Sequence, residues 1–170
     1  MEINRDKYKL RNWTLADAAS LAYYANNINI WNHLRDAFPH PYTQADGEAF
    51  ISMVLQRNAP QEFAIEIGGK AVGGIGFVPG QDVERLSAEI GYWLGQAFWN
   101  KGIMTSALHD LTEYVFSHTE IIRLFAFVFE TNTASQYVLE KNGFRKAATL
   151  RKAVFKNGQI MDMFCYELLK

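Results

Sequence analysis

The segment AEIGYWLGQAFWNKGIMTSAL, residues 88–108, joins a strand, a loop and a helix start in an unusual way. Its first part alternates as a β-strand does, yet it carries an acid, Glu89, before the pattern breaks at Gly95. The short loop Trp99–Gly102 then leads directly into a helical pattern. An acid inside a strand and a cation-bearing loop at a helix start raise the question of a binding or catalytic site, for which structural roles are the alternatives.

The strand in this segment has two different faces. Alternation places one set of residues on one face and a second set on the other: Leu86, Ala88, Ile90, Tyr92 and Leu94, against Ser87, Glu89, Gly91 and Trp93. A glutamate beside a small glycine can lie at the floor of a cleft and accept a proton directly or through water. A solvated sheet face and a buried structural ion pair are the alternatives for Glu89.

The loop before the helix has the features of a phosphate site. Gly102 lets the backbone approach a ligand closely, and the first helical turn leaves backbone N–H groups unpaired. Lys101 and the positive end of the helix add attraction for an anion. These groups fit a phosphate or a pyrophosphate. A tight turn without a ligand is the alternative for Gly102.

The composition indicates one domain, residues 1–170. The chain is 49% hydrophobic, and 17 basic residues against 18 acidic ones give a net charge of −1, which argues against nucleic acid as a partner. No apolar run approaches the ~20 residues of a membrane span, and the first residues lack the apolar core of a signal peptide. A single cysteine, Cys165, fits a reducing compartment, so we expect a cytoplasmic protein in which this residue fills a strand.

The remaining patterns predict strands and helices in a mixed order. Strands are expected at residues 8–11, 62–67, 71–78, 84–94 and 121–129, the last covered on both faces, followed by two closing strands from 144 with a turn at Asn157–Gly158. Helices are expected at residues 14–26, 28–35, from 43 onward with Phe50, Met53 and Val54 at helical spacing, 102–118 and 131–142. This order predicts a mixed sheet with helices on both faces.

Four motifs in order, AEIGYWL, WNKGIMTSAL, LFAFVF and NTASQYVLEKNGF, resemble those of the GNAT acetyltransferase superfamily. With LRNWTLAD and FPHPYT near the N-terminus, nearly the whole chain is similar to the branch of the ribosomal-protein N-terminal acetyltransferases, the Rim type. The resemblance implies a single α/β (α+β) domain with a mixed sheet of six or seven strands flanked by helices. It also implies that two parallel strands splay near Leu94 and Phe129 to form an acetyl-CoA cleft.

The same resemblance assigns the residues that bind acetyl-CoA. They are Tyr92, Trp93, Leu94, Trp99, Asn100, Lys101, Gly102, Ile103, Met104, Thr105 and Asn132. The pyrophosphate is expected on the loop from Trp99 to Thr105. The loop usual in the superfamily is Arg/Gln-x-x-Gly-x-Gly/Ala, and this chain departs from it with Trp99 in the first place and Met104 in the last.

The resemblance also assigns the catalytic groups. Glu89 is the expected base, Ser135 the expected general acid near the sulfur, and Asn132 a contact of the CoA arm. Many superfamily members instead use a tyrosine seven residues after the asparagine, where this chain has Leu139, and Tyr137 lies on a different part of the helix. Capping of the helix is the alternative role for Asn132 and Ser135.

These features predict an acetyl-CoA-dependent N-acetyltransferase in which a neutral amine attacks the thioester directly. An α-amine with a pKa near 8 is far more often neutral at pH 7 than a lysine amine near 10.4, a difference of about 3.3 kcal/mol, so the α-amine of a peptide or protein is the favoured acceptor. A small amine as acceptor and a non-catalytic acyl-CoA sensor are the alternatives.

His33, His40 and Tyr42 are candidates for contacts with the acceptor, and no metal site is expected. A second copy of the chain is a further candidate partner.

Overall fold

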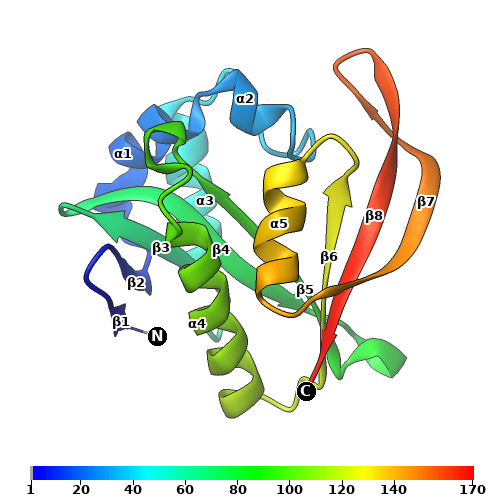
Figure 1. The fold of residues 1–170 in the computed structure, drawn as a ribbon. Coiled ribbons are helices and arrows are strands. Elements are labelled where there is room, and N and C mark those ends of the chain that lie inside the picture. Colours follow the sequence, from blue (N-terminus) through cyan, green and yellow to red (C-terminus); the bar gives the residue numbers. More distant parts are fainter. Residues whose placement is uncertain (1) are drawn as a thin grey trace. The chain divides into compact units, whose positions relative to one another are not determined.

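The strands of the computed structural model, which describes residues 2–170, hydrogen-bond in the order β1-β2-β3-β4-β5-β6-β8-β7 (Figure 1). The pair β5–β6 is parallel, whereas β6–β8 and β7–β8 are antiparallel, so the sheet is mixed. The chain clusters into two compact units, and both β4 and β5 pass from one unit into the other. The fold class is thus the mixed α+β sheet that the sequence predicts.

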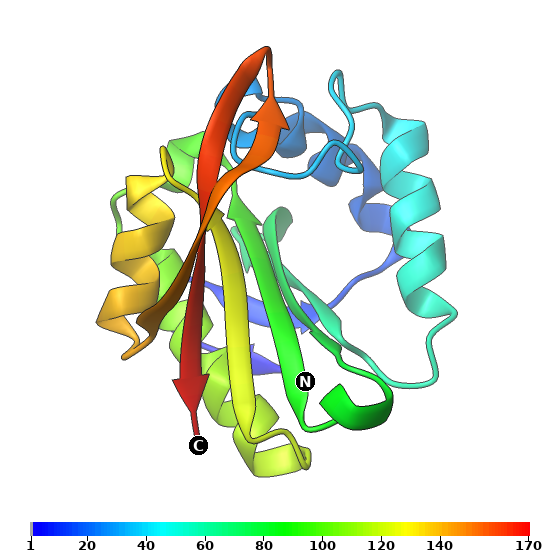
Figure 2. The same ribbon diagram turned by 90° about the vertical axis from the view of Figure 1, so that its right-hand side faces the viewer.

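Unit 1 contains the residues up to Gly76 together with Tyr92–Ile103. Its elements are β1 (Ile3–Asn4), β2 (Lys9–Asn12), α1 (Ala18–Ala25), α2 (Ile28–Trp31), α3 (Gln44–Leu55), β3 (Glu62–Ile67), most of β4 (Lys70–Pro79) and the end of β5 (Ser87–Leu94). Helices α1 and α3 lie side by side (Figures 1 and 2). They share a buried cluster with the sheet that includes Trp13, Leu21, Ile51 and Ala64.

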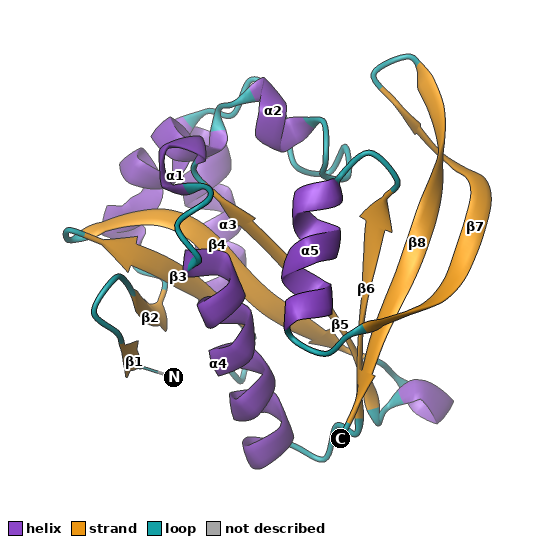
Figure 3. Cartoon of the chain, viewed as in Figure 1, coloured by secondary structure: helices purple, strands orange, loops and turns teal. Residues whose placement is uncertain are grey.

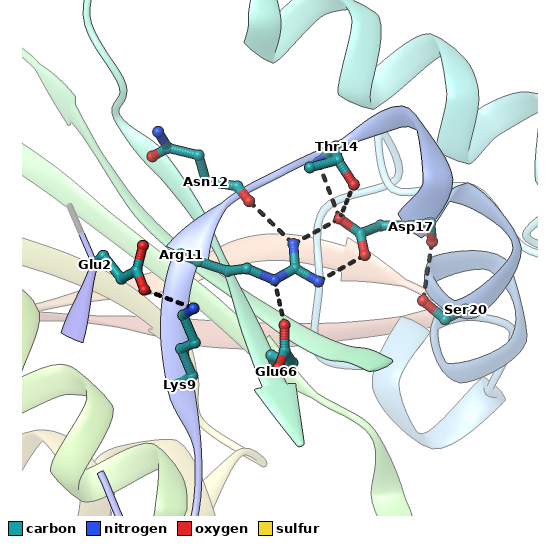
Figure 4. A network of polar contacts seen from close by, with 8 residues as sticks. All are labelled: Glu2, Lys9, Arg11, Asn12, Thr14, Asp17, Ser20 and Glu66. Atoms are coloured by element: carbon teal, nitrogen blue, oxygen red, sulfur yellow. Dashed lines mark hydrogen bonds and ion pairs between the residues drawn. The ribbon is translucent and has the colours of Figure 1, made fainter. Parts of the chain in front are cut away.

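A polar network holds the start of α1 against the strands of unit 1 (Figure 4). The Arg11 guanidinium donates to both carboxylate oxygens of Asp17, at 2.7 Å each, and also to Glu66 on β3. The Thr14 N–H and hydroxyl donate to the Asp17 carboxylate, both at 2.9 Å. Thr14 is an N-cap as predicted, but of the short 3₁₀ helix Leu15–Asp17 that precedes α1. Burial opposes the ionisation of Asp17, yet the hydrogen bonds from Arg11 and Thr14 prevail and lower its pKa.

Asp17→Asn should therefore lower the free energy of unfolding by about 2 kcal/mol at pH 7, because Arg11 loses one of its two charged partners. A lowered pKa stabilises the fold above the unfolded-state value and ceases to do so as pH falls. The deficit of the variant should accordingly shrink below about pH 4. Urea unfolding of both proteins at several pH values measures this, with the exposed Asp6→Asn as a control. A deficit that does not change with pH would contradict the role given to the charge.

Unit 2 contains Phe77–Gly91 and Met104–Lys170. Its elements are the remaining parts of β4 and β5, α4 (Ile103–His118), β6 (Arg123–Phe129), α5 (Thr133–Lys141), β7 (Arg145–Lys156) and β8 (Gln159–Leu169). Within this unit α4 and α5 lie on one side of β5, β6 and β8 (Figures 1 and 2). The residues packed there include Leu108, Leu111, Leu124 and Leu139, all fully buried. The opposite face of these strands carries no helix of unit 2.

Several predicted element bounds are wrong by a few residues. Figure 3 shows the helices, strands and loops as the structure has them. The sheet has eight strands rather than six or seven because Ile3–Asn4 pairs with β2. The strand expected from residue 84 begins at Ser87, since Asp82–Glu84 forms a 3₁₀ helix. The second helix ends at Trp31, four residues early, and turns replace its predicted end.

Two predictions about burial are also wrong. The strand β6 is not covered on both faces, because Leu124, Ala126 and Val128 are buried whereas Arg123, Phe125 and Phe127 are only half-buried. On α3, Met53 is exposed although its spacing suggested the core face. The turn at Asn157–Gly158 is confirmed, with both φ angles positive at 48° and 76°.

Candidate functional site

The loop that follows β5 in unit 1 is closed by its own side chains. The Trp99 indole N–H donates to the Leu94 carbonyl at 2.7 Å, so the tryptophan ties the loop back to the end of the strand. The Lys101 ammonium donates to the Ala97 carbonyl at 2.8 Å and lies 5.4 Å from the centre of the Phe98 ring. Trp99 thus has an architectural role here, which accounts for its presence where the superfamily usually has Arg or Gln.

The backbone of this loop is shaped for an anion. Asn100 and Gly102 both have positive φ angles, 58° and 74°, and such alternation turns successive N–H groups toward one concavity. Nothing lies within 4 Å of the place where a Cβ of Gly102 would be, so this side of the loop is open. Helix α4 begins at the next residue, Ile103, and contributes unpaired N–H groups and a positive end.

The two residues after Gly102 anchor the helix in the core. Ile103 is 4% exposed and Met104 is 9% exposed. Because so little of the Met104 side chain is accessible, it does not crowd the open side of the loop, although the superfamily usually has a small residue there. Thr105, the last residue of the predicted loop, has its carbonyl bonded by the Asn142 amide of α5 at 3.1 Å.

In unit 2, β5 presents the two faces predicted from its sequence. Ala88 and Ile90 are buried beneath the helices, whereas Glu89 is half-buried on the other face. Gly91, the next residue on the Glu89 face, is exposed and has nothing within 4 Å of its Cβ position. The carboxylate therefore lies beside open space on the sheet face that no helix of unit 2 covers.

Neighbouring strands add aromatic and charged groups to this face. Glu89 is in register with Phe125 on β6, which is in turn in register with Glu167 on β8. The Arg123 guanidinium donates to Glu167 at 2.9 Å and lies 4.8 Å from the centre of the Phe125 ring. Burial raises the pKa of the nearby Cys165 thiol, so it stays protonated and fills the strand as predicted.

At the start of α5, Asn132 and Ser135 form the cap that the sequence offered as their alternative role. The Asn132 side-chain oxygen accepts from the Ser135 backbone N–H at 3.1 Å. Leu139 is fully buried, so no polar group can act from that position. Tyr137 is 58% exposed and lies under the Lys141 ammonium at 5.3 Å, which confirms that it points elsewhere. The capping bond uses the backbone N–H of Ser135 and not its hydroxyl.

The three candidates for acceptor contacts lie in unit 1 and differ from one another. His33 has a buried Nδ1 with no hydrogen-bond partner among the described residues, and burial lowers the pKa of this histidine. His40 is exposed and packs near Trp31 at 5.7 Å between ring centres. Tyr42 is 6% exposed within the core cluster, and burial together with Asp46 raises its pKa to about 12.

One acidic residue near Trp93 was missed by the sequence analysis. Glu62, the first residue of β3, is in register with Gly76 on β4, and burial raises its pKa to about 7. Its carboxylate lies 3.9 Å from Arg57, too far for a strong ion pair to offset the loss of water. The one available signal was a glutamate facing a glycine across the predicted hairpin.

Residues 7–145 match the family model described as "Acetyltransferase (GNAT) domain". The chain belongs to the GNAT family of acetyltransferases. This GNAT enzyme is an N-acetyltransferase that uses acetyl-CoA, as its sequence predicted.

The chain is also similar to individual acetyltransferases in sequence and in fold. The enzyme is 37% identical to YdaF of Bacillus subtilis over 52% of this chain, a match that spans about half of that relative (49%). It is 31% identical to the ribosomal-protein-serine acetyltransferase of Escherichia coli over 67% of this chain and 63% of that one. Among solved structures, RimL, a ribosomal L7/L12 alpha-N-protein acetyltransferase in complex with coenzyme A, has the same fold. The TM-score is 0.88 at 22% identity, and the match covers 99% of this chain and 98% of that one.

Within residues 2–170, no group of three or more His, Cys, Asp or Glu side chains could hold a metal ion. Over the same range, no helix has the length and apolar character needed to span a membrane.

The anion-shaped loop gives a direct prediction for acetyl-CoA binding. Acetyl-CoA at a hundred times its Kd should stabilise the protein by about 2.7 kcal/mol and raise the melting temperature. Gly102→Glu should remove this shift because it puts bulk and negative charge on the open side of the loop. Thermal unfolding with and without acetyl-CoA measures the effect.

Gly102→Ala is the matched control for that variant. Alanine at this position must adopt the same unfavourable positive φ as glutamate, but it adds no charge and little bulk. The shift of its melting temperature with acetyl-CoA should therefore stay close to that of the wild type. If Gly102→Glu kept the full shift, the loop would not be the phosphate site.

Proposed function

We propose that this enzyme transfers the acetyl group of acetyl-CoA to the α-amine of a peptide or protein, by direct attack in a ternary complex. The observation that carries the proposal is the loop Asn100–Gly102, whose backbone is open and shaped for an anion at the start of α4. The pyrophosphate of acetyl-CoA would lie there, and Asn132 would contact the CoA arm. Both assignments follow the expectations from the family resemblance.

The chemistry assigned to the chain is alignment, polarisation and proton transfer. A backbone N–H of Tyr92–Leu94 would polarise the thioester carbonyl as the amine attacks. Glu89 would take the proton that the nitrogen loses after attack, and its place beside the open Gly91 supports this role. Ser135 would supply a proton to the departing CoA thiolate.

The choice of an α-amine is supported by its acidity and by a relative. An α-amine is neutral at pH 7 about two hundred times more often than a lysine amine, so it needs less help from the enzyme. The Escherichia coli relative is named for acetylation of a ribosomal protein at serine, which is consistent with a protein acceptor. We therefore extend the proposal to a cytoplasmic protein acceptor, of which a ribosomal protein is the first to test.

We further propose that the two units work as one N-acetyltransferase domain. The boundaries between them follow Gly76, Gly91 and Ile103, inside β4, β5 and α4, whereas domain boundaries usually lie in exposed linkers. Gly76 itself is buried. A single cooperative unfolding transition would agree with one domain.

Release of CoA thiol over a panel of acceptors tests the proposed function. The panel holds peptides with a free α-amine, the same peptides blocked at the N-terminus but carrying lysine, and small amines such as polyamines and aminoglycosides. Peptides with a free α-amine should give the highest kcat/KM. Faster turnover of a small amine would overturn the acceptor class, and acetyl-CoA binding without turnover of any amine would indicate a sensor.

Glu89→Gln keeps the shape of the side chain and removes the base. Turnover near pH 7 should fall by roughly 10²–10⁴-fold, the range typical of general acid–base catalysis. The shift of melting temperature with acetyl-CoA should remain. Glu84→Gln, a change at an exposed residue just before β5, is the matched control and should leave the rate unchanged. A Glu89→Gln variant with the wild-type rate would return this residue to a structural role.

Ser135→Ala and Asn132→Ala separate the two roles at the start of α5. A thiol has a pKa near 8.5, so the thiolate leaves readily and Ser135→Ala should reduce turnover only modestly, with acetyl-CoA affinity kept. Asn132→Ala should first weaken acetyl-CoA binding. Binding measured by the melting shift and turnover at saturating acetyl-CoA distinguish them. If both variants lost affinity alike, Ser135 would be a cap and the proton would come from solvent.

A further inference from the structure

The Glu62 carboxylate lies over the neighbouring strand rather than over its own. Glu62 is in register with Gly76, and a Cβ on that glycine would come within 2.2 Å of the Glu62 carboxylate oxygen. The side chain thus occupies the space that a residue other than glycine would fill. This displaces the charge from β3 by about one strand spacing, ~4.8 Å, toward β5, which is the next strand after β4.

Trp93 occupies the adjacent position on the same face. A Cβ on Gly74 would lie 2.9 Å from the Trp93 indole nitrogen, so the indole covers Gly74. Gly74 and Gly76 are two residues apart on β4, about 7 Å, and therefore face the same side. Glu62 and Trp93 thus lie side by side on one face of unit 1, and the Trp93 backbone belongs to the group assigned to the thioester.

The surroundings of Glu62 suit a group that exchanges protons near neutral pH. Its side chain is 23% exposed, so water can still reach it. Arg57 is the charged group beside it, and at 3.9 Å it does not hold the carboxylate firmly ionised. Burial raises the pKa of Glu62 to about 7, close to that of an α-ammonium group near 8.

We propose that Glu62 removes the first proton from the arriving acceptor, converting its ammonium group into the neutral amine that attacks acetyl-CoA. This inference rests on the proposed function and deepens it. An ammonium group must lose two protons to become an amide. Glu62 takes the first before attack and passes it to solvent, and Glu89 takes the second after the N–C bond forms. As the C–S bond breaks, the thiolate gains one proton, so one proton is released overall.

The test compares two acceptors that differ strongly in basicity. One peptide has a free α-amine, and the other has an aminooxyacetyl group at the same end, which is already uncharged at neutral pH. For the α-amine peptide, Glu62→Gln should lower kcat/KM by up to about tenfold at pH 7, since only about one-tenth of the amine is neutral in solution. The loss should disappear near pH 9. For the aminooxy peptide no loss is expected at either pH.

Three further variants make the result specific. Glu62→Asp keeps the charge but is too short to reach over Gly76, so it should show the same loss with the α-amine peptide alone. Glu66→Gln, on the same strand but bonded to Arg11, should not distinguish the two acceptors. Glu89→Gln should slow both acceptors. The melting shift with acetyl-CoA confirms that each variant is folded and binds its donor.

Two results would overturn the inference in different ways. If Glu62→Gln slowed both acceptors equally at every pH, Glu62 would be a structural residue and the proposed function would stand. If the wild type acetylated neither acceptor, the proposed function would fail, and the role of Glu62 would fail with it.

Discussion

The parallel register of Ser87–Glu89 with Arg123–Phe125 determines which side chains of unit 2 can act on a ligand. It places Ala88 and Leu124 beneath α4 and α5, where both are fully buried. By alternation it leaves Glu89 on the opposite face, beside Gly91. A shift of one residue would bury the carboxylate among leucines and expose the apolar set, at a cost of several kcal/mol. Packing of the apolar strand residues against the helices thus determines which face of the sheet carries the proposed base.

Glycine has a comparable role in unit 1, where it makes room for larger groups. Gly74 and Gly76 leave space over β4 for the Trp93 indole and for the Glu62 carboxylate. Gly102 instead supplies a positive φ, which turns the chain into α4 with its N–H groups exposed. Small residues therefore set both the shape of the anion loop and the position of a second acid. The positions of these groups therefore depend on glycines, which have no side chain.

Local signals in the sequence were sufficient for much of this arrangement. The turn at Asn157–Gly158, the cap at Thr14 and the two faces of β5 depend on neighbours a few residues apart, and all three are found in the structure. Glu62 could not be recognised in this way because its pKa depends on burial, and its position depends on Gly76, a partner across a hairpin. The hydrogen bond from Trp99 to Leu94 was missed because a residue type alone does not show where its N–H donates.

The amine that receives the acetyl group can be identified directly by a competition between an α-amine and a lysine amine. A peptide that carries both a free α-amine and one lysine is incubated at pH 7 with the enzyme and acetyl-CoA labelled in its acetyl group. Fragmentation in a mass spectrometer then locates the label. We expect label on the α-amine, with the lysine amine unmodified during the initial rate. Label on the lysine amine, or no enzymatic labelling, would contradict this expectation.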